Sequence, residues 1–150
     1  MSMSGIEVDP NIAILFNEMK LRSTHKYATF KIENKKKIVE DVLSDPVSTA
    51  SREEDKAEFD KLKSLITSSN EPRYILYDFS FPMTKDNRSI KKIAFIFWCP
   101  DDSKIGDKMI YASSKDSIKK SFSGLSLEFQ ANDKADFDYN TLADEVERKA

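Results

Sequence analysis

Two aromatic and β-branched runs constrain the fold of this 150-residue chain more than any other feature. They are Arg73–Phe81 and Ile93–Cys99, and the charged segment Pro82–Lys92 joins them. Neither run alternates strictly between apolar and polar residues, as a strand with one solvent-facing side does. They therefore predict a pair of central strands that are covered on both faces.

The segments before these runs predict a helix, a hairpin and a second helix. The first helix opens at Asp9-Pro10, where the aspartate can cap free amides and the proline loses no hydrogen bond. Alternating residues over 28–42 predict two strands joined by a polar turn. The spacing of Ser51 and Glu54 is that of a capping box, which predicts the start of the second helix.

After the central runs, a third helix, one strand and a final helix are expected. Ser113 and Asp116 have capping-box spacing, so the third helix should begin at about Ser114, after a polar turn. Residues 125–130 alternate as a one-sided strand. On the final helix, charges four residues apart predict two ion pairs, Asp144 with Arg148 and Glu145 with Lys149.

The order of these elements predicts the fold class. Strands come in neighbouring pairs rather than in strict alternation with helices, which favours an α+β sheet with helices on both faces over a doubly wound fold. The length of 150 residues predicts one domain over 1–150. Residues 1–8 are polar and unpatterned, and a mobile tail is expected there.

Composition narrows the classes of function. The 24 Lys and Arg nearly balance the 26 Asp and Glu, so no global field favours nucleic acid or a membrane. One cysteine, Cys99, and one histidine, His25, are too few for the usual zinc sites, and three scattered glycines form no phosphate-binding loop. With no internal disulfide and no signal-like segment, the chain is expected to be cytoplasmic. With no zinc ligand set and no phosphate-binding loop in its sequence, it is expected to be a binding protein without a cofactor rather than an enzyme.

Two clusters of positive charge are candidate binding sites. One lies on and before the third expected helix and includes Lys108, Lys115, Asp116, Lys119 and Lys120. It is either a cationic docking ridge or an ordinary solvated helix face. The other comprises Arg88, Lys91 and Lys92 at the start of a strand. It is either a binding patch or a set of lysines that protects a sheet edge, and the residues alone leave both choices open.

Four stretches of sequence resemble a known family. They are Met3–Ile6, Phe95–Asp101, Lys108–Asp116 and Leu127–Ala131. In order and spacing they are similar to the actin-depolymerising factor/cofilin family over essentially the whole chain, and the third stretch is highly specific. The resemblance implies a gelsolin-like domain with a central mixed sheet between helices. It also implies a protein that binds actin monomers and filaments, prefers the ADP form, and severs and depolymerises filaments.

The resemblance further implies two actin-binding surfaces. The surface for monomers and filaments would comprise Ser4, Gly5, Lys108, Met109, Lys115, Asp116, Lys119 and Lys120. The filament-only surface would comprise Arg88, Lys91, Lys92, Asp144 and Arg148. At Ile90, Gly106 and Glu145 the chain departs from relatives that carry a basic residue, and this bears on filament affinity and severing. Ser4 matches the serine whose phosphorylation inhibits the family.

Other interpretations remain at this point. One is a coactosin-like module of the same fold that binds the sides of filaments without severing them. The other is a small acid–base hydrolase, which requires a cleft with strongly shifted carboxylates. Phosphoinositides are an additional expected partner, because anionic headgroups attract the same lysines and would compete with actin. The chain is expected to act as a monomer.

Overall fold

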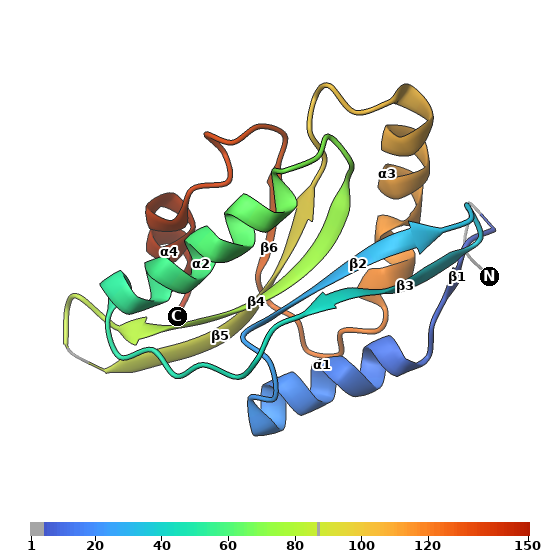
Figure 1. Cartoon of the computed structure of the whole chain (residues 1–150). Coiled ribbons are helices and arrows are strands. Elements are labelled where there is room, and N and C mark those ends of the chain that lie inside the picture. The colour runs from blue at the N-terminus through green and yellow to red at the C-terminus, as the bar shows by residue number, and fades with distance from the viewer. Residues whose placement is uncertain (1–4, 87) are drawn as a thin grey trace.

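The structure is a computed structural model that describes residues 5–86 and 88–150. The described residues form a six-stranded sheet with four helices. Figure 1 shows α2 and α4 on one face of the sheet and α1 and α3 on the other, which confirms the expected α+β fold. Along the chain the elements are β1 (Glu7–Val8), α1 (Asn11–Arg22), β2 (Tyr27–Glu33), β3 (Lys37–Leu43), α2 (Arg52–Ile66), β4 (Arg73–Pro82), β5 (Ser89–Trp98), α3 (Ile105–Lys119), β6 (Glu128–Ala131) and α4 (Tyr139–Arg148).

The sheet is mixed, with the strand order β1-β3-β2-β4-β5-β6. The four middle strands pair antiparallel, whereas β1 lies parallel to β3 and β6 lies parallel to β5. The two aromatic and β-branched runs form the hairpin β4–β5, which is paired from Arg73 opposite Trp98 to Pro82 opposite Ser89. The connecting segment is therefore shorter than expected, because β5 already begins at Ser89.

Side chains of the central hairpin alternate between two cores. One core lies beneath α1 and α3 and receives Tyr74, Leu76, Phe95 and Phe97. The other lies beneath α2 and α4 and receives Ile75, Tyr77, Phe79, Phe81, Ile90, Ala94, Ile96 and Trp98. Over residues 74–79 and 94–98 both faces of the hairpin are thus removed from water, and this explains why these stretches lack an apolar–polar alternation.

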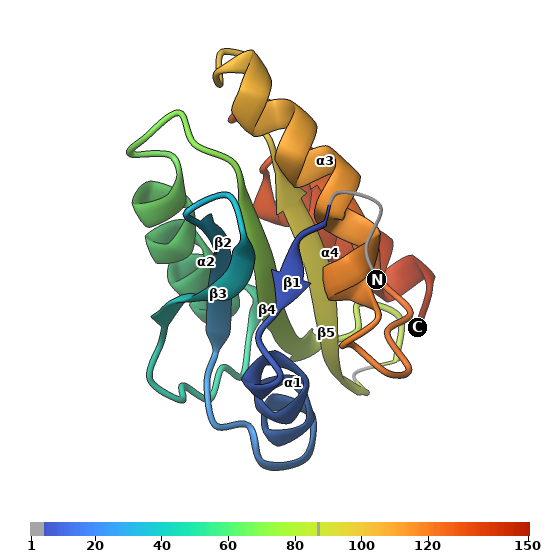
Figure 2. The ribbon, with the colours of Figure 1, turned by 90° about the vertical axis from the view of Figure 1, so that its right-hand side faces the viewer.

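The first described residues are ordered, in contrast to the mobile tail expected over 1–8. Ile6 is buried, and Glu7–Val8 pair in parallel with Lys37–Ile38. Figure 2 shows β1 between β3 and the lower part of α3. A two-residue strand is too short to show a period in the sequence, so only the folded chain reveals it.

Helix α3 begins at Ile105, so the helix start expected near Ser114 is wrong. Ser114 is fully buried within the helix. The Ser113 hydroxyl donates to a carbonyl one turn earlier at 3.2 Å, as serines inside helices do, instead of capping a helix start. The first half of the helix is anchored by Tyr111, whose hydroxyl accepts the Ile32 amide of β2 at 2.8 Å. Tertiary contacts outweigh the local capping pattern here.

The remaining helices follow the expected local signals. The Asn11 amide donates to the Asp9 carboxylate at 2.9 Å, and the Glu54 amide donates to the Ser51 hydroxyl at 3.2 Å. These bonds satisfy amides that have no partner inside the helix. None of the helices in the described part of the chain combines the length and the apolar character that a membrane crossing requires.

Candidate functional site

The exposed side of α3 changes from apolar to charged along its length. Ile105 and Met109 are 75% and 67% exposed, one turn apart. Asp116 and Lys120 continue the same side, because residues three or four apart share a helix face. We call this the α3 surface, and its exposed residues are Ile105, Met109, Ala112, Ser113, Asp116 and Lys120. Exposed apolar side chains bordered by charge are typical of a protein-binding surface.

An open groove of about 660 Å³ lies beside the C-terminal part of α3. It brings the start of the chain against the helix, and its lining includes Gly5, Ile6, Val8, Lys37, Ser117 and Lys120. Gly5 has a φ of 75°, which is in the left-handed region that favours glycine. Lys120 forms no ion pair with any residue in 5–86 or 88–150, so its ammonium group remains available to a partner.

Lys115 and Lys119 face a different way, toward strand β6. Glu128 lies 2.7 Å from the Lys119 ammonium and 3.5 Å from that of Lys115. The hydrogen bond to Glu128 raises the pKa of Lys119. Burial opposes ionisation of Glu128, but the two lysines lower its pKa overall. The expected ridge therefore consists of two groups. Lys115 and Lys119 are bound to Glu128, whereas Asp116 and Lys120 are exposed to solvent.

We expect Glu128→Gln to lower the free energy of unfolding by about 0.5 to 1 kcal/mol at neutral pH, since exposed pairs are screened by solvent. The pKa of Glu128 is lowered from 4.5, so its contribution is complete above that value and is lost as pH falls through the folded-state pKa. The difference between wild type and variant, measured by urea denaturation, should therefore shrink in acid. Glu18→Gln, on the exposed side of α1, should show little difference at any pH. A Glu128→Gln deficit that persists in acid would contradict the pair.

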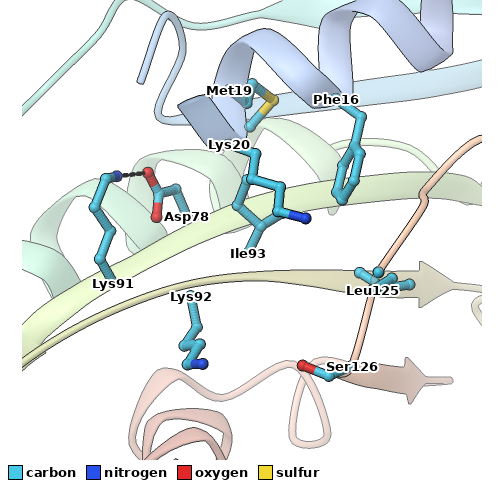
Figure 3. A pocket seen from close by; sticks show the side chains of 10 residues that line it. Phe16, Met19, Lys20, Asp78, Lys91, Lys92, Ile93, Leu125 and Ser126 are labelled. Carbon is cyan, nitrogen blue, oxygen red and sulfur yellow. Dashed lines mark hydrogen bonds and ion pairs between the residues drawn. The ribbon is translucent and has the colours of Figure 1, made fainter. Parts of the chain in front are cut away.

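The second expected cluster is divided between the two faces of β5. Lys91 forms an ion pair with the buried carboxylate of Asp78 on the α1 side, whereas Lys92 points to the opposite face (Figure 3). There Lys92 lines a small hollow together with Lys149. Arg88 pairs with its neighbour Asp86 at 2.8 Å. These three basic residues therefore form no single patch, because adjacent strand residues point in opposite directions.

The charges on α4 pair differently from the prediction. Asp144 accepts from Arg52 of α2 at 2.7 Å, and Arg148 pairs with Glu145 at 2.7 Å. The expected pairs of Asp144 with Arg148 and of Glu145 with Lys149 are therefore wrong. Residues three apart on a helix form an ion pair as readily as residues four apart, so Arg148 can pair with Glu145. Asp144 pairs with Arg52 of another helix, and no local sequence pattern predicts that α2 packs beside α4.

The three positions at which this chain lacks the basic residue of the family, Ile90, Gly106 and Glu145, have different structural environments. Ile90 is 4% exposed in the core beneath α2 and α4, so an apolar residue suits this position. Gly106 is exposed in the first turn of α3, with open space where a side chain would project. Glu145 is held by Arg148 on the surface of α4. Ser4, the expected phosphorylation site, lies outside the described residues.

The pocket drawn in Figure 3 does not favour acid–base catalysis. It has a volume of about 220 Å³ and lies between α1, the β4–β5 hairpin and residues 124–126. Burial raises the pKa of Asp78, and Lys91 opposes this shift. Asp78 is the only carboxylate among the described residues that line the pocket, and it is bound to Lys91. The described lining of this pocket therefore offers no pair of carboxylates for acid–base work.

Comparison with known proteins decides the family. A family model described as cofilin/tropomyosin-type actin-binding protein matches residues 5–147. The chain belongs to the actin-depolymerising factor/cofilin family. It is 37% identical over 140 residues to actin-depolymerizing factor 1 of Arabidopsis thaliana, which covers 93% of each chain. The crystal structure of Plasmodium berghei actin depolymerization factor 2 covers 98% of this chain and 96% of its own, with a TM-score of 0.78 and 32% identity.

Another solved structure shares only the fold with this cofilin-family chain. Human coactosin-like protein has a TM-score of 0.70 at 16% identity and covers 100% of this chain and 93% of its own. The family assignment confirms the resemblance carried by the four stretches. The third stretch, Lys108–Asp116, lies wholly on α3, and its exposed contribution to the α3 surface is Met109, Ala112, Ser113 and Asp116.

Sequence reasoning missed three residues around these sites. Ile105 was assigned to a polar turn, although its four-residue spacing to Met109 is a helical signal. Glu128 was identified only as an exposed strand position, and no local pattern links it to α3. Arg52 was assigned to a helix start, and its contact with Asp144 depends on how two helices pack.

Proposed function

We propose that this chain binds actin, both as monomers and in filaments, and removes subunits from filaments. The observation that carries the proposal is the α3 surface, on which exposed Ile105 and Met109 lead to Asp116 and Lys120. An apolar helix face enters a hydrophobic cleft of a partner, while charges at its end pair at the rim. Met109 is unbranched and adapts to an irregular cleft. The relatives, which are named actin-depolymerizing factors, support this partner.

The proposed contacts keep both surfaces implied by the family. Monomers and filaments would be bound through Ser4, Gly5, Lys108, Met109, Lys115, Asp116, Lys119 and Lys120, and filaments also through Arg88, Lys91, Lys92, Asp144 and Arg148. Lys120 and Lys92 are assigned the leading roles, because both are exposed and neither forms an ion pair with a described residue. Those charged residues that form ion pairs within the chain must break them before they can pair with a residue of actin.

Several finer properties belong to the same proposal. The chain severs filaments, prefers ADP-actin, acts as a cytoplasmic monomer and turns over no substrate. Phosphate on Ser4 adds about −1.5 to −2 charges next to the residues that meet actin, and so weakens binding. Phosphoinositide headgroups compete with actin for the lysines of α3.

Sedimentation at high speed tests the proposal with the full chain. Added protein should move actin from the pellet to the supernatant, and microscopy should show shorter filaments as the protein concentration rises. A coactosin-like side binder would pellet with the filaments and leave the amount of pelleted actin unchanged. Absence of both effects would contradict actin binding.

Glu145→Lys should strengthen filament binding by a few-fold and increase the frequency of severing. The change reverses a charge on the exposed side of α4 and releases Arg148, which Glu145 now holds at 2.7 Å. Monomer affinity should not change, because α4 lies on the other face of the sheet from α3.

The gain should shrink at high salt, since exposed charges are screened within about 8 to 10 Å. Co-sedimentation at two salt concentrations measures this effect. Glu58→Lys is a control on α2, where another glutamate forms a local ion pair. Equal or weaker filament binding by Glu145→Lys at low salt would show that α4 does not face the filament.

A further inference from the structure

Arg52 connects three elements at the hairpin end of the molecule. It stands in the first turn of α2, and its guanidinium lies 4.8 Å from the centre of the Phe81 ring of β4. The same group donates to Asp144 at 2.7 Å and to Glu147 at 3.3 Å, both on α4. Although burial opposes its charge, these two carboxylates raise the pKa of Arg52 overall. A single side chain therefore holds α2, β4 and α4 together.

Glu147 extends this connection to the end of the β4–β5 hairpin. Its carboxylate accepts the Thr84 amide at 3.0 Å and the Thr84 hydroxyl at 2.5 Å. Thr84 lies two residues after the end of β4, where the chain turns toward β5. The side chain of Glu147 is only 12% exposed, so it offers little surface to a partner. Its two carboxylate oxygens are instead used within the protein.

The proposed filament-binding residues of this chain lie on both elements that Arg52, Glu147 and Thr84 connect. Arg88 and Lys92 belong to the hairpin, whereas Asp144 and Arg148 belong to α4. No ion pair between described residues joins Arg88 or Lys92 directly to α4. The side-chain path from Arg52 through Glu147 to Thr84 links the hairpin end to α4 by hydrogen bonds, beside the apolar core that the two elements share.

We infer that Arg52 and Glu147 are positioning residues that hold the end of the β4–β5 hairpin against α4, and thereby set the spacing of the filament-binding charges. The inference rests on the proposed actin function and adds two residues that do not themselves contact actin. Asp144 takes part in the same connection, so its carboxylate is oriented by Arg52 before any filament is met. Preorganised groups bind more tightly than mobile ones, because less freedom is lost on association.

Arg52→Ala and Glu147→Gln in the full chain test the inference. We expect filament affinity, measured by co-sedimentation, to fall by about fivefold to tenfold in each variant. Monomer affinity should stay within about twofold, because a rigid α3 surface is untouched. Hydrogen exchange at the Thr84 amide should accelerate in Glu147→Gln, where that amide loses a charged acceptor, and in Arg52→Ala, where the acceptor Glu147 loses its partner on α2. Arg52→Lys should recover part of the filament affinity through one of the two carboxylates.

Lys56→Ala is the matched control on the same helix. Lys56 pairs with Asp60 at 2.7 Å within α2, and it forms no ion pair with a described residue of Tyr139–Arg148, so its loss should leave both affinities and Thr84 exchange unchanged. Glu147→Gln keeps the size of the side chain and remains testable if Arg52→Ala folds poorly. The unfolding transition of each variant shows that it is folded at the assay temperature.

The possible results separate this inference from the proposed function. Equal losses of monomer and filament affinity would overturn it, because a general loss of structure affects both surfaces. Unchanged filament affinity with faster Thr84 exchange would also overturn it, since the hairpin would then be free and still bind. A wild-type chain that binds neither form of actin would refute the proposed function itself and the inference with it.

Discussion

Lys120→Ala should weaken binding to actin monomers by about tenfold, or about 1.4 kcal/mol, without changing the melting temperature. Lys120 is exposed at the end of α3, beside the groove that contains Gly5. Because it has no ion pair with a described residue, its loss removes no charge contact within the fold. Fluorescence titration with labelled monomers measures the affinity, and calorimetry measures the melting temperature.

Two other lysines sharpen this prediction. Lys119→Ala should lower stability slightly as well as affinity, because it breaks the 2.7 Å contact with Glu128. Lys61→Ala breaks a comparable 2.9 Å pair with Glu58 on α2, on the opposite face of the sheet, so it should lower stability slightly while leaving monomer affinity unchanged. If Lys120→Ala binds monomers as tightly as wild type, α3 is an ordinary solvated helix face and the proposed contact is wrong.

Lys26→Met should destabilise the fold by about 3 to 5 kcal/mol, because it leaves a buried carboxylate without its counter-charge. Lys26 and Asp55 are 2% and 0% exposed, and their charged atoms lie 2.6 Å apart. Tyr77 and Tyr139 donate their hydroxyls to the same carboxylate at 2.8 and 2.7 Å. These bonds join α2 to β4 and α4. Because Asp55 is fully buried, water cannot replace Lys26 as the partner of its charge.

Urea denaturation checks the size of this effect, which corresponds to a fall of about 6 to 20 °C in melting temperature. Adding Asp55→Asn to Lys26→Met should recover part of the loss, since the pocket is then neutral and still hydrogen-bonded. Lys31→Met, which breaks a 3.8 Å contact with Asp41 near the surface, is the control and should have little effect. A Lys26→Met chain as stable as wild type would show that the buried charge is tolerated alone.

Local patterns in the sequence determined most of the elements. The hairpin of β4 and β5 and the caps at Asp9 and Ser51 were predicted from neighbouring residues. Each depends on interactions within a few residues or on the repeat of apolar side chains, and these leave a direct trace in the sequence. The family resemblance was likewise visible in the sequence, because it consists of residues in a fixed order.

Tertiary structure alone decided the rest, through contacts between residues far apart in the chain. Strand β1 forms only because β3 offers a free edge, and α3 extends back to Ile105 because Tyr111 is anchored on β2. The sequence placed Lys115 and Lys119 on one ridge with Asp116 and Lys120, but Glu128 of β6 pairs with the two lysines. Ion pairs form with whichever opposite charge the packing brings close, and sequence spacing constrains that choice only within a single helix or strand.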